Sequence, residues 1–292
     1  MHAYLPAIGF GQIKKKSQLQ QLLSSVQSFP DEVRSIRIDE ESSLVVYTKE
    51  VAPNIGLMIC GEQDVQGSFQ MEYYAPYILS DVCSSKAECT IERKSAAEAY
   101  DGVCDDVRLG LNLIFAVNNF MEYRKYQVVQ GFYPTVTGVC MSALSTQGKI
   151  LLPIYKRPES VRLAEKRERG RQKLIEAARE GSQDAIDNLT MDDMNLSNKV
   201  GRLLNSCDIY TMVESSIMPC GMESDRYTII GEILEVVPLV NEISKEPLCQ
   251  LDVMCNQIRI RVLINRSGLM GEPMVGRRFK GDIWLQGTVN FV

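Results

Sequence analysis

Apolar and polar side chains alternate near the C-terminal end of the chain. Odd positions carry the apolar residues Phe279, Ile283, Leu285, Val289 and Phe291, and even positions carry Lys280, Asp282, Gln286, Thr288 and Asn290. A period of two predicts a β-strand with one buried face. Gly281 and Gly287 fall on inward positions, where glycine suits a bend or a bulge. Trp284, the only tryptophan, falls on the polar face, so we expect it to pack against another part of the chain or against a partner.

A second alternation predicts a β-hairpin before this strand. Apolar side chains occupy odd positions in the first arm and even positions in the second: Cys249, Leu251, Val253 and Cys255, then Ile258, Ile260, Val262 and Ile264. A two-residue turn at Asn256 and Gln257 would pair residue 255 with 258, 253 with 260 and 251 with 262, which puts all of them on one face. Asp252 would then lie opposite Arg261. With a strand near 227–236, these elements predict a small β-barrel of the oligonucleotide/oligosaccharide-binding (OB) type over residues 226–292, or else an open meander.

The first 155 residues begin with a helix and continue with strands. Leu19, Leu22, Leu23 and Val26 follow Ser17 and Gln20 at the spacing of an amphipathic helix with a capping box. Beyond it, apolar residues recur at every second position in the runs Ile36/Ile38, Leu44/Val46, Phe69/Met71/Tyr73, Cys89/Ile91 and Leu109 to Val117. We therefore expect an α+β domain with a mostly antiparallel sheet over residues 1–155, interrupted by a short helix near Ala96 to Ala99.

Charged residues dominate the next segment. Residues 156–179 contain nine basic and four acidic side chains, which is typical of a solvated helix and leaves an acidic partner, RNA or a membrane surface as alternatives. A second helix is expected from Thr190, and a third over Ile209, Met212, Val213 and Ile217. Residues 156–225 are thus predicted to form a helical connector between the two sheets.

Composition narrows the functional classes. The chain has 292 residues, a net charge of −5 and nine cysteines without a C-x-x-C pair, so we expect packed, reduced thiols and no metal site. No apolar run has the length of a membrane-spanning helix, and no leader segment is evident, so the cytoplasm is the expected compartment. The sequence indicates no cofactor, because nucleotide-binding glycine loops are absent.

Histidine chemistry is almost excluded, because the only histidine is His2, beside a terminus. A carboxylate-dependent enzyme in the first domain stays open and would need Glu72, Glu92 or Asp105 to converge in one cleft. Asp105 belongs to an Asp- and Gly-rich stretch around Cys104, where neighbouring carboxylates would raise the thiol pKa.

The candidate binding residues lie at the start of the last strand. Arg277, Arg278 and Lys280 provide positive charge, while Trp284 and Gln286 follow on the outward face. Cations beside an exposed ring suit single-stranded nucleic acid or a protein partner, which predicts a non-enzymatic binding protein. The alternative is a structural or assembly protein in which Trp284 is buried at a domain or subunit interface.

Three segments carry a resemblance to a known family. They are Met1-His2 with Ala7-Ile8-Gly9-Phe10; Gly102-Val103-Cys104-Asp105-Asp106 leading to Leu113-Ile114-Phe115; and Gly276-Arg277-Arg278-Phe279-Lys280-Gly281 with Ile283-Trp284-Leu285-Gln286-Gly287. In these segments the chain is similar to an uncharacterised domain-of-unknown-function family of anaerobic Gram-positive bacteria of the clostridial type. The resemblance implies a bacterial cytoplasmic protein and carries no assigned activity, cofactor or catalytic residue.

Overall fold

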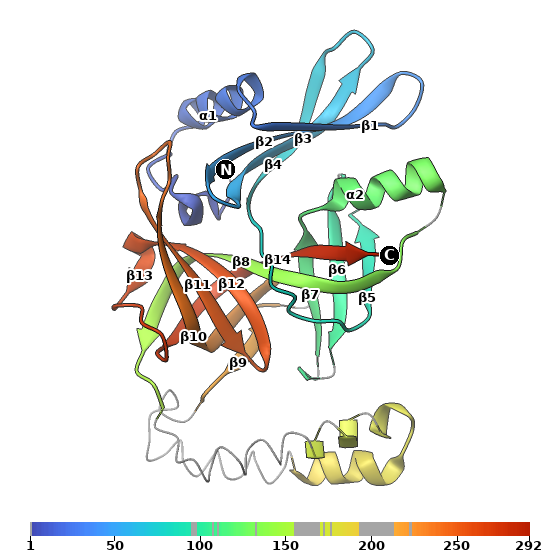
Figure 1. Cartoon of the computed structure of the whole chain (residues 1–292), viewed down its shortest axis with the longest axis vertical. Coiled ribbons are helices and arrows are strands. Elements are labelled where there is room, and N and C mark those ends of the chain that lie inside the picture. The colour runs from blue at the N-terminus through green and yellow to red at the C-terminus, as the bar shows by residue number, and fades with distance from the viewer. Residues whose placement is uncertain are drawn as a thin grey trace.

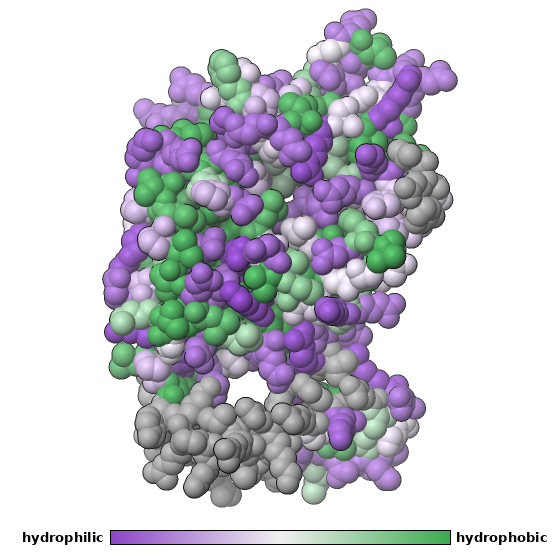
Figure 2. Space-filling view, viewed as in Figure 1, coloured by the Kyte–Doolittle hydropathy of each residue, from purple (hydrophilic) through white to green (hydrophobic). Residues whose placement is uncertain are grey.

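The computed structural model combines two β-sheets with short helices, which confirms the predicted α+β class (Figure 1). It describes residues 2–94, 98–106, 108–109, 111–131, 133–154, 170–171, 173–175, 177–192, 213–221 and 224–292. Figure 2 shows hydrophobic side chains gathered over β10 and β11, on the left of the view.

The first sheet is an antiparallel meander with the order β1-β2-β3-β4. Its strands are β1 (Glu32–Arg37), β2 (Ser42–Ala52), β3 (Ile55–Asp64) and β4 (Phe69–Ile78). The predicted N-terminal helix is confirmed as α1 (Lys16–Ser28), and it buries Leu19, Leu23 and Val26 against this sheet. The short helix η1 (Leu5–Ile8) joins the same apolar cluster.

The second sheet contains ten strands, five of which close into a ring. The ring consists of β8 (Val136–Leu151), β10 (Arg226–Val240), β11 (Pro247–Cys255), β12 (Ile258–Asn265) and β14 (Arg278–Phe291). Closure depends on β8, which pairs with β12 in parallel and with β14 in antiparallel orientation. The ring therefore includes a strand from before the charged segment as well as strands after it, and the division at residues 155 and 225 stays a prediction.

Shorter elements extend this sheet. They are β5 (Cys89–Arg93), β6 (Tyr100–Asp106), β7 (Leu111–Val117), β9 (Ser216–Pro219) and β13 (Leu269–Met270), with α2 (Phe120–Lys125), η2 (Tyr126–Gln130) and η4 (Arg266–Gly268) between strands. β7 pairs with β14, and β5 forms the edge beyond β6. Ile217, expected in a helix, lies in β9, so that prediction was wrong: four residues of the segment pair with β10. Within the expected connector, residues 170–171, 173–175, 177–179 and 183–192 are helical, but Thr190 lies inside a helix and does not begin one. Residues 98 and 99 of the short helix expected near Ala96 to Ala99 are not helical. Residues 155–169, 193–212 and 95–97 lie outside the described residues.

The predicted hairpin is confirmed in its register. Cys255 lies opposite Ile258, and Asp252 lies opposite Arg261. The turn residues Asn256 and Gln257 have φ angles of 46° and 65°, the left-handed values that a tight two-residue turn needs. Local alternation thus determined both the pairing and the turn.

The predicted alternation in β14 is also confirmed. Phe279, Ile283 and Leu285 are at most 1% exposed and fill the interior of the ring. The ring of Phe279 occupies the space above Gly281, where an added Cβ would lie 2.6 Å from the Phe279 Cζ. The register of β14 against β8 shifts between Gly281 and Ile283. Glycine at this position therefore lets the strand curve and the aromatic ring pack.

A buried polar junction joins the two sheets at the end of β4. The side-chain amide of Gln286 accepts a hydrogen bond from Ile78 N at 3.1 Å and donates one to Pro76 O at 2.9 Å. Ser142 Oγ and Asn118 Nδ2 both donate to Ile78 O, at 2.6 and 3.0 Å. These bonds fix the meander over β14 and α2, and a cleft lies between them.

Candidate functional site

Trp284 is half-buried under the N-terminal segment of its own chain. Its ring stacks on Tyr4 at a centroid distance of 5.6 Å and lies 4.8 Å from the His2 ring. The indole Nε1 donates to Asp225 Oδ2 at 2.7 Å. The expectation that this ring packs on another part of the chain is met by η1 and the residues before it.

The other predicted binding residues do not converge with Trp284. Arg278 is buried and donates to the carbonyls of Leu152 and Val213. Gln286 is 1% exposed, and its side chain bonds the backbone of Ile78 at the end of β4. Arg277 donates to Glu272 O at 2.9 Å. From Arg277 to Gln286 the strand spans roughly 30 Å, so the five residues do not form one site.

Lys280 lies in a separate hollow of about 730 Å³ on the outer face of the ring. Lys149 of β8 lies directly opposite it and is exposed. Two like charges in a cross-strand pair are unfavourable unless an anion or an acidic group compensates them. Asp282 lines the same hollow, so its three charged side chains leave a formal charge of +1 there.

The carboxylates of the alternative enzyme hypothesis are not brought together. Glu72 Oε2 accepts a hydrogen bond from Glu98 N at 3.1 Å. Asp105 pairs with Arg179 at 2.7 Å, and Glu92 lies on β5 opposite Asp101. Among the described lining residues of the cleft below the meander, none of the three predicted carboxylates occurs.

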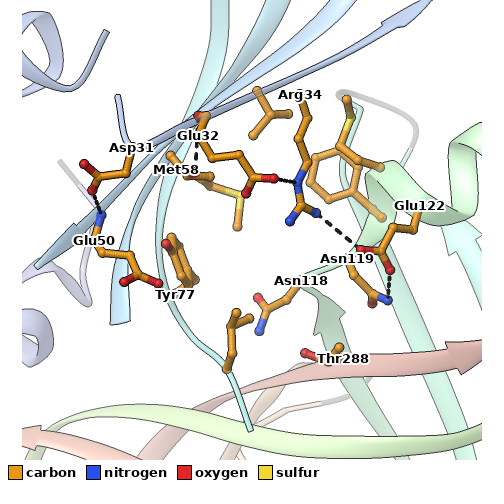
Figure 3. Close-up of a pocket in the computed structure, with 15 residues that line it drawn as sticks. Asp31, Glu32, Arg34, Glu50, Met58, Tyr77, Asn118, Asn119, Glu122 and Thr288 are labelled. Atoms are coloured by element: carbon orange, nitrogen blue, oxygen red, sulfur yellow. Dashed lines mark hydrogen bonds and ion pairs between the residues drawn. The ribbon is translucent and has the colours of Figure 1, made fainter. Parts of the chain in front are cut away.

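That cleft lies between the meander and α2 and has a volume of about 410 Å³ (Figure 3). Alternate residues of β2 point into it, because Val46, Thr48 and Glu50 share one face of the strand. Glu32 and Met58 are the cross-strand neighbours of Thr48 on either side. Sheet periodicity therefore places a carboxylate and an apolar side chain in the same row.

The Tyr77 side chain lies across β3, because its neighbour on that strand is a glycine. Gly56 lies between Glu50 and Tyr77 in the sheet register, and an added Cβ there would lie 2.6 Å from the Tyr77 hydroxyl oxygen. Figure 3 shows the Glu50 carboxylate directed toward the Tyr77 ring. Burial, with Glu50 next in effect, raises the pKa of Tyr77 well above its usual value, so the hydroxyl is protonated at neutral pH.

The opposite wall is fixed by the start of α2. Asn119 Nδ2 donates a hydrogen bond to Val289 O at 2.9 Å, and Asn119 Oδ1 accepts one from Val289 N at 3.0 Å. Its Nδ2 also donates to Glu122 Oε2 at 2.9 Å. The Arg34 guanidinium lies between Glu32 at 2.8 Å and Glu122 at 3.4 Å, so it bridges β1 and α2 across the mouth. The hydrogen bond that Arg34 Nε donates to Glu32 Oε1 raises the pKa of Arg34.

The cleft combines an apolar floor with an acidic mouth. Its buried floor consists of Val46, Met58, Tyr77, Phe120 and Met121. Its carboxylates are Asp31, Glu32, Glu50 and Glu122. Lys49 Nζ lies 2.6 Å from Asp31 Oδ1, and the hydrogen bond that it donates lowers the pKa of Asp31. Against Arg34 and Lys49, the four carboxylates leave a formal charge of −2.

Two polar groups in the cleft have unused bonding capacity. Thr288 Oγ1 is buried and has no hydrogen-bond partner among the described residues. Glu50 makes no ion pair with any residue that the structure describes. Buried polar atoms normally have partners, so the Thr288 hydroxyl is an unsatisfied group in the wall of the cleft.

The chemistry of the lining suits binding. Among its described residues there is no histidine or cysteine, and in the described part of the chain no group of three His, Cys, Asp or Glu side chains is placed to hold a metal ion. The eight described cysteines are free thiols, whereas Cys207 lies outside the described residues. None of the described helices has the length and apolar character to cross a membrane.

Sequence reasoning missed this cleft, although one signal was present. The alternating run Leu44, Val46, Thr48 and Glu50 changes from apolar to polar on a single strand face. Such a change marks the position where a buried face leaves the core. The contributions of Glu122 and Thr288 carried no local signal, because they come from distant elements.

A family described as "Domain of unknown function, E. rectale Gene description (DUF3881)" matches residues 5–287. No curated protein and no solved structure matches the chain.

Proposed function

The chain belongs to DUF3881, a family of unknown function, and we propose from the geometry of the cleft that it is a binding protein for an organic cation with an apolar body. The observation that carries this proposal is the acidic mouth above the buried apolar floor. The volume of about 410 Å³ lies within the range of small-ligand sites.

The charge of the mouth determines the class of ligand. An anion would meet Glu50 and Glu122 in a partly enclosed space, where like charges repel strongly. An ammonium or guanidinium group could instead pair with Glu50, while its apolar part displaces water from Met58, Phe120 and Met121. Tyr77 adds an aromatic surface that attracts cations.

The test compares two probes of equal shape, phenethylammonium and phenethyl alcohol. We expect the cation to bind more tightly, and we expect Glu50→Gln to weaken it about fivefold, the equivalent of about 1 kcal/mol for one partly exposed ion pair. Binding can be measured by calorimetry and by NMR shifts of the cleft methyl groups.

Glu235→Gln is the matched control, because Glu235 lies on β10, pairs with Arg259 at 3.4 Å and does not line the cleft. It should leave the affinity unchanged. Equal affinity for the alcohol and the ammonium ion, or no effect of Glu50→Gln, would contradict the proposal.

A second candidate retains the hypothesis of nucleic-acid binding at the ring. We infer that the ring is an OB-like barrel, since β10, β11 and β12 form a meander and β8 closes it beside β12 and β14. The exposed Lys149, in a hollow whose formal charge is +1, supports an anionic ligand there. The cleft is the better-supported site, because Arg278, Trp284 and Gln286 already bond within the chain. The cytoplasm remains the compartment that we propose, on the basis of the free thiols.

A further inference from the structure

The edge of the meander beside the cleft has no partner strand. Among the described strands, β1 pairs only with β2. Ile38 N bonds Ser42 O at 3.1 Å, and antiparallel pairing alternates from there. The even positions of β1 therefore bond β2, and the N–H and C=O groups of Val33, Ser35 and Arg37 point away from the sheet. An edge of this kind is a template for another strand.

A groove runs along this edge. Its volume is about 600 Å³, with Ile36 and Arg37 of β1 on one wall and Lys125 and Val128 of α2 and η2 on the other. The groove and the cleft share Glu32, Arg34, Met121 and Glu122. A ligand bound along the edge would thus reach the acidic mouth without crossing any other element.

We propose that the cation held by the cleft belongs to an extended peptide that adds to β1 as a fifth, antiparallel strand. This inference rests on the proposed function. Main-chain bonds to the edge would supply affinity, and alternate side chains would enter the groove, as in other cases of strand addition. β1 has six residues and spans about 20 Å, which matches a segment of about six residues.

Charge determines the direction and composition of the peptide. The Glu32 end of β1 lies beside Asp31, Glu50 and Glu122, whereas the groove that Arg37 lines also contains the exposed Lys125. An antiparallel strand begins near Arg37 and ends near Glu32. The peptide therefore carries an acidic residue first, an apolar residue in the middle, where Ile36 lines the groove, and a lysine or arginine last, all on one face.

The probe is acetyl-Thr-Glu-Thr-Val-Thr-Lys-Thr-amide, and its control has the glutamate and lysine exchanged. We expect the first peptide to bind at least about tenfold more tightly than the second, since exchange places like charges together at both ends. Binding should also slow hydrogen exchange at the amides of Val33, Ser35 and Arg37. Equal affinity for both peptides, or unchanged exchange at these amides, would overturn the proposal.

Ser35→Pro separates strand addition from cation binding. Proline removes an N–H that points away from β2, a position that edge strands tolerate. We expect this variant to lose peptide affinity about tenfold and to retain phenethylammonium, while Ser35→Ala, which keeps the N–H, binds both. A variant that remains folded by circular dichroism and binds the peptide normally would overturn the inference alone.

If the unmodified protein does not bind phenethylammonium, the proposed function itself is overturned. A second copy of the chain could also cover β1, and sedimentation tests this by measuring the oligomeric state. A dimer that Ser35→Pro dissociates would show that a second copy occupies the edge, and would contradict the peptide proposal.

Discussion

His2 illustrates how a single residue acquires its properties from the fold. Its backbone N–H donates to the Tyr74 hydroxyl at 2.8 Å, and its Nδ1 accepts a hydrogen bond from Tyr4 N at 3.3 Å. Burial, followed by the charge of Arg226, lowers the pKa of His2 from 6.5 to about 4, although nearby Asp225 acts in the opposite direction. The imidazole is therefore neutral in the folded protein at pH 5.

This shift predicts a loss of stability in mild acid. The unfolded chain takes up a proton near pH 6.5 and the folded chain only near pH 4, so the free energy of unfolding should fall as the pH drops through that window. The loss should be at most about 3 kcal/mol. His2→Gln should be less sensitive, as measured by urea unfolding at pH 7 and 4.5. The same pH dependence in both proteins would argue against a half-buried, neutral imidazole at position 2.

At the scale of the element, the hairpin of β11 and β12 holds a strained turn. Asn256 tolerates a left-handed conformation, but Gln257 does so at a steric cost, since its φ is 65°. The backbone of Gln257 also accepts a bond from Arg108 Nη1 at 2.9 Å, which any residue at that position can maintain. The side chain at 257 is therefore free to change.

Gln257→Gly should stabilise the protein by about 0.5–1 kcal/mol, because Asn-Gly is the preferred pair in this turn. The control is Gln250→Gly, in the extended part of β11, which should destabilise by about 1 kcal/mol. Both effects can be read from denaturant midpoints. A destabilised Gln257→Gly variant would show that the turn does not need a left-handed residue.

At the scale of the whole molecule, the two sheets depend on buried polar bonds at the end of β4. In the first sheet, β4 pairs with β3 along one edge only. On its other edge the Gln286 amide bonds Ile78 N and Pro76 O, and both residues are buried. Apolar packing alone would leave these groups unpaired. The orientation of the cleft walls therefore depends on this amide together with Ser142 and Asn118, which both donate to Ile78 O.

Gln286→Leu should destabilise the protein by about 2–3 kcal/mol, since it removes one partner from each of two buried groups. Thr137→Val, an exposed change on the neighbouring strand β8, should have little effect. Urea unfolding of both variants is the measurement. A loss below about 0.5 kcal/mol for Gln286→Leu would mean that water replaces the amide.

Local periodicity was enough to identify α1, the hairpin register and the inward residues of β14. Each of these depends on neighbours a few positions apart, whose shared face follows from the helix or strand repeat. The identity of the candidate site was not accessible in this way. Gln286 and Lys280 share one face of β14 in the sequence pattern, yet one is buried under β4 and the other lines a surface hollow.

The sequence alone therefore determined which side chains share a face, how the hairpin pairs, and that Trp284 must pack outside the ring. Only the tertiary structure decided what covers each face: His2 and Tyr4 over Trp284, β4 over Gln286, and α2 opposite Glu50. It also decided that β8 closes the ring beside β12, a pairing of residues more than a hundred positions apart. The physical reason is that periodicity fixes the direction of a side chain relative to its own strand, whereas long-range packing selects its neighbours.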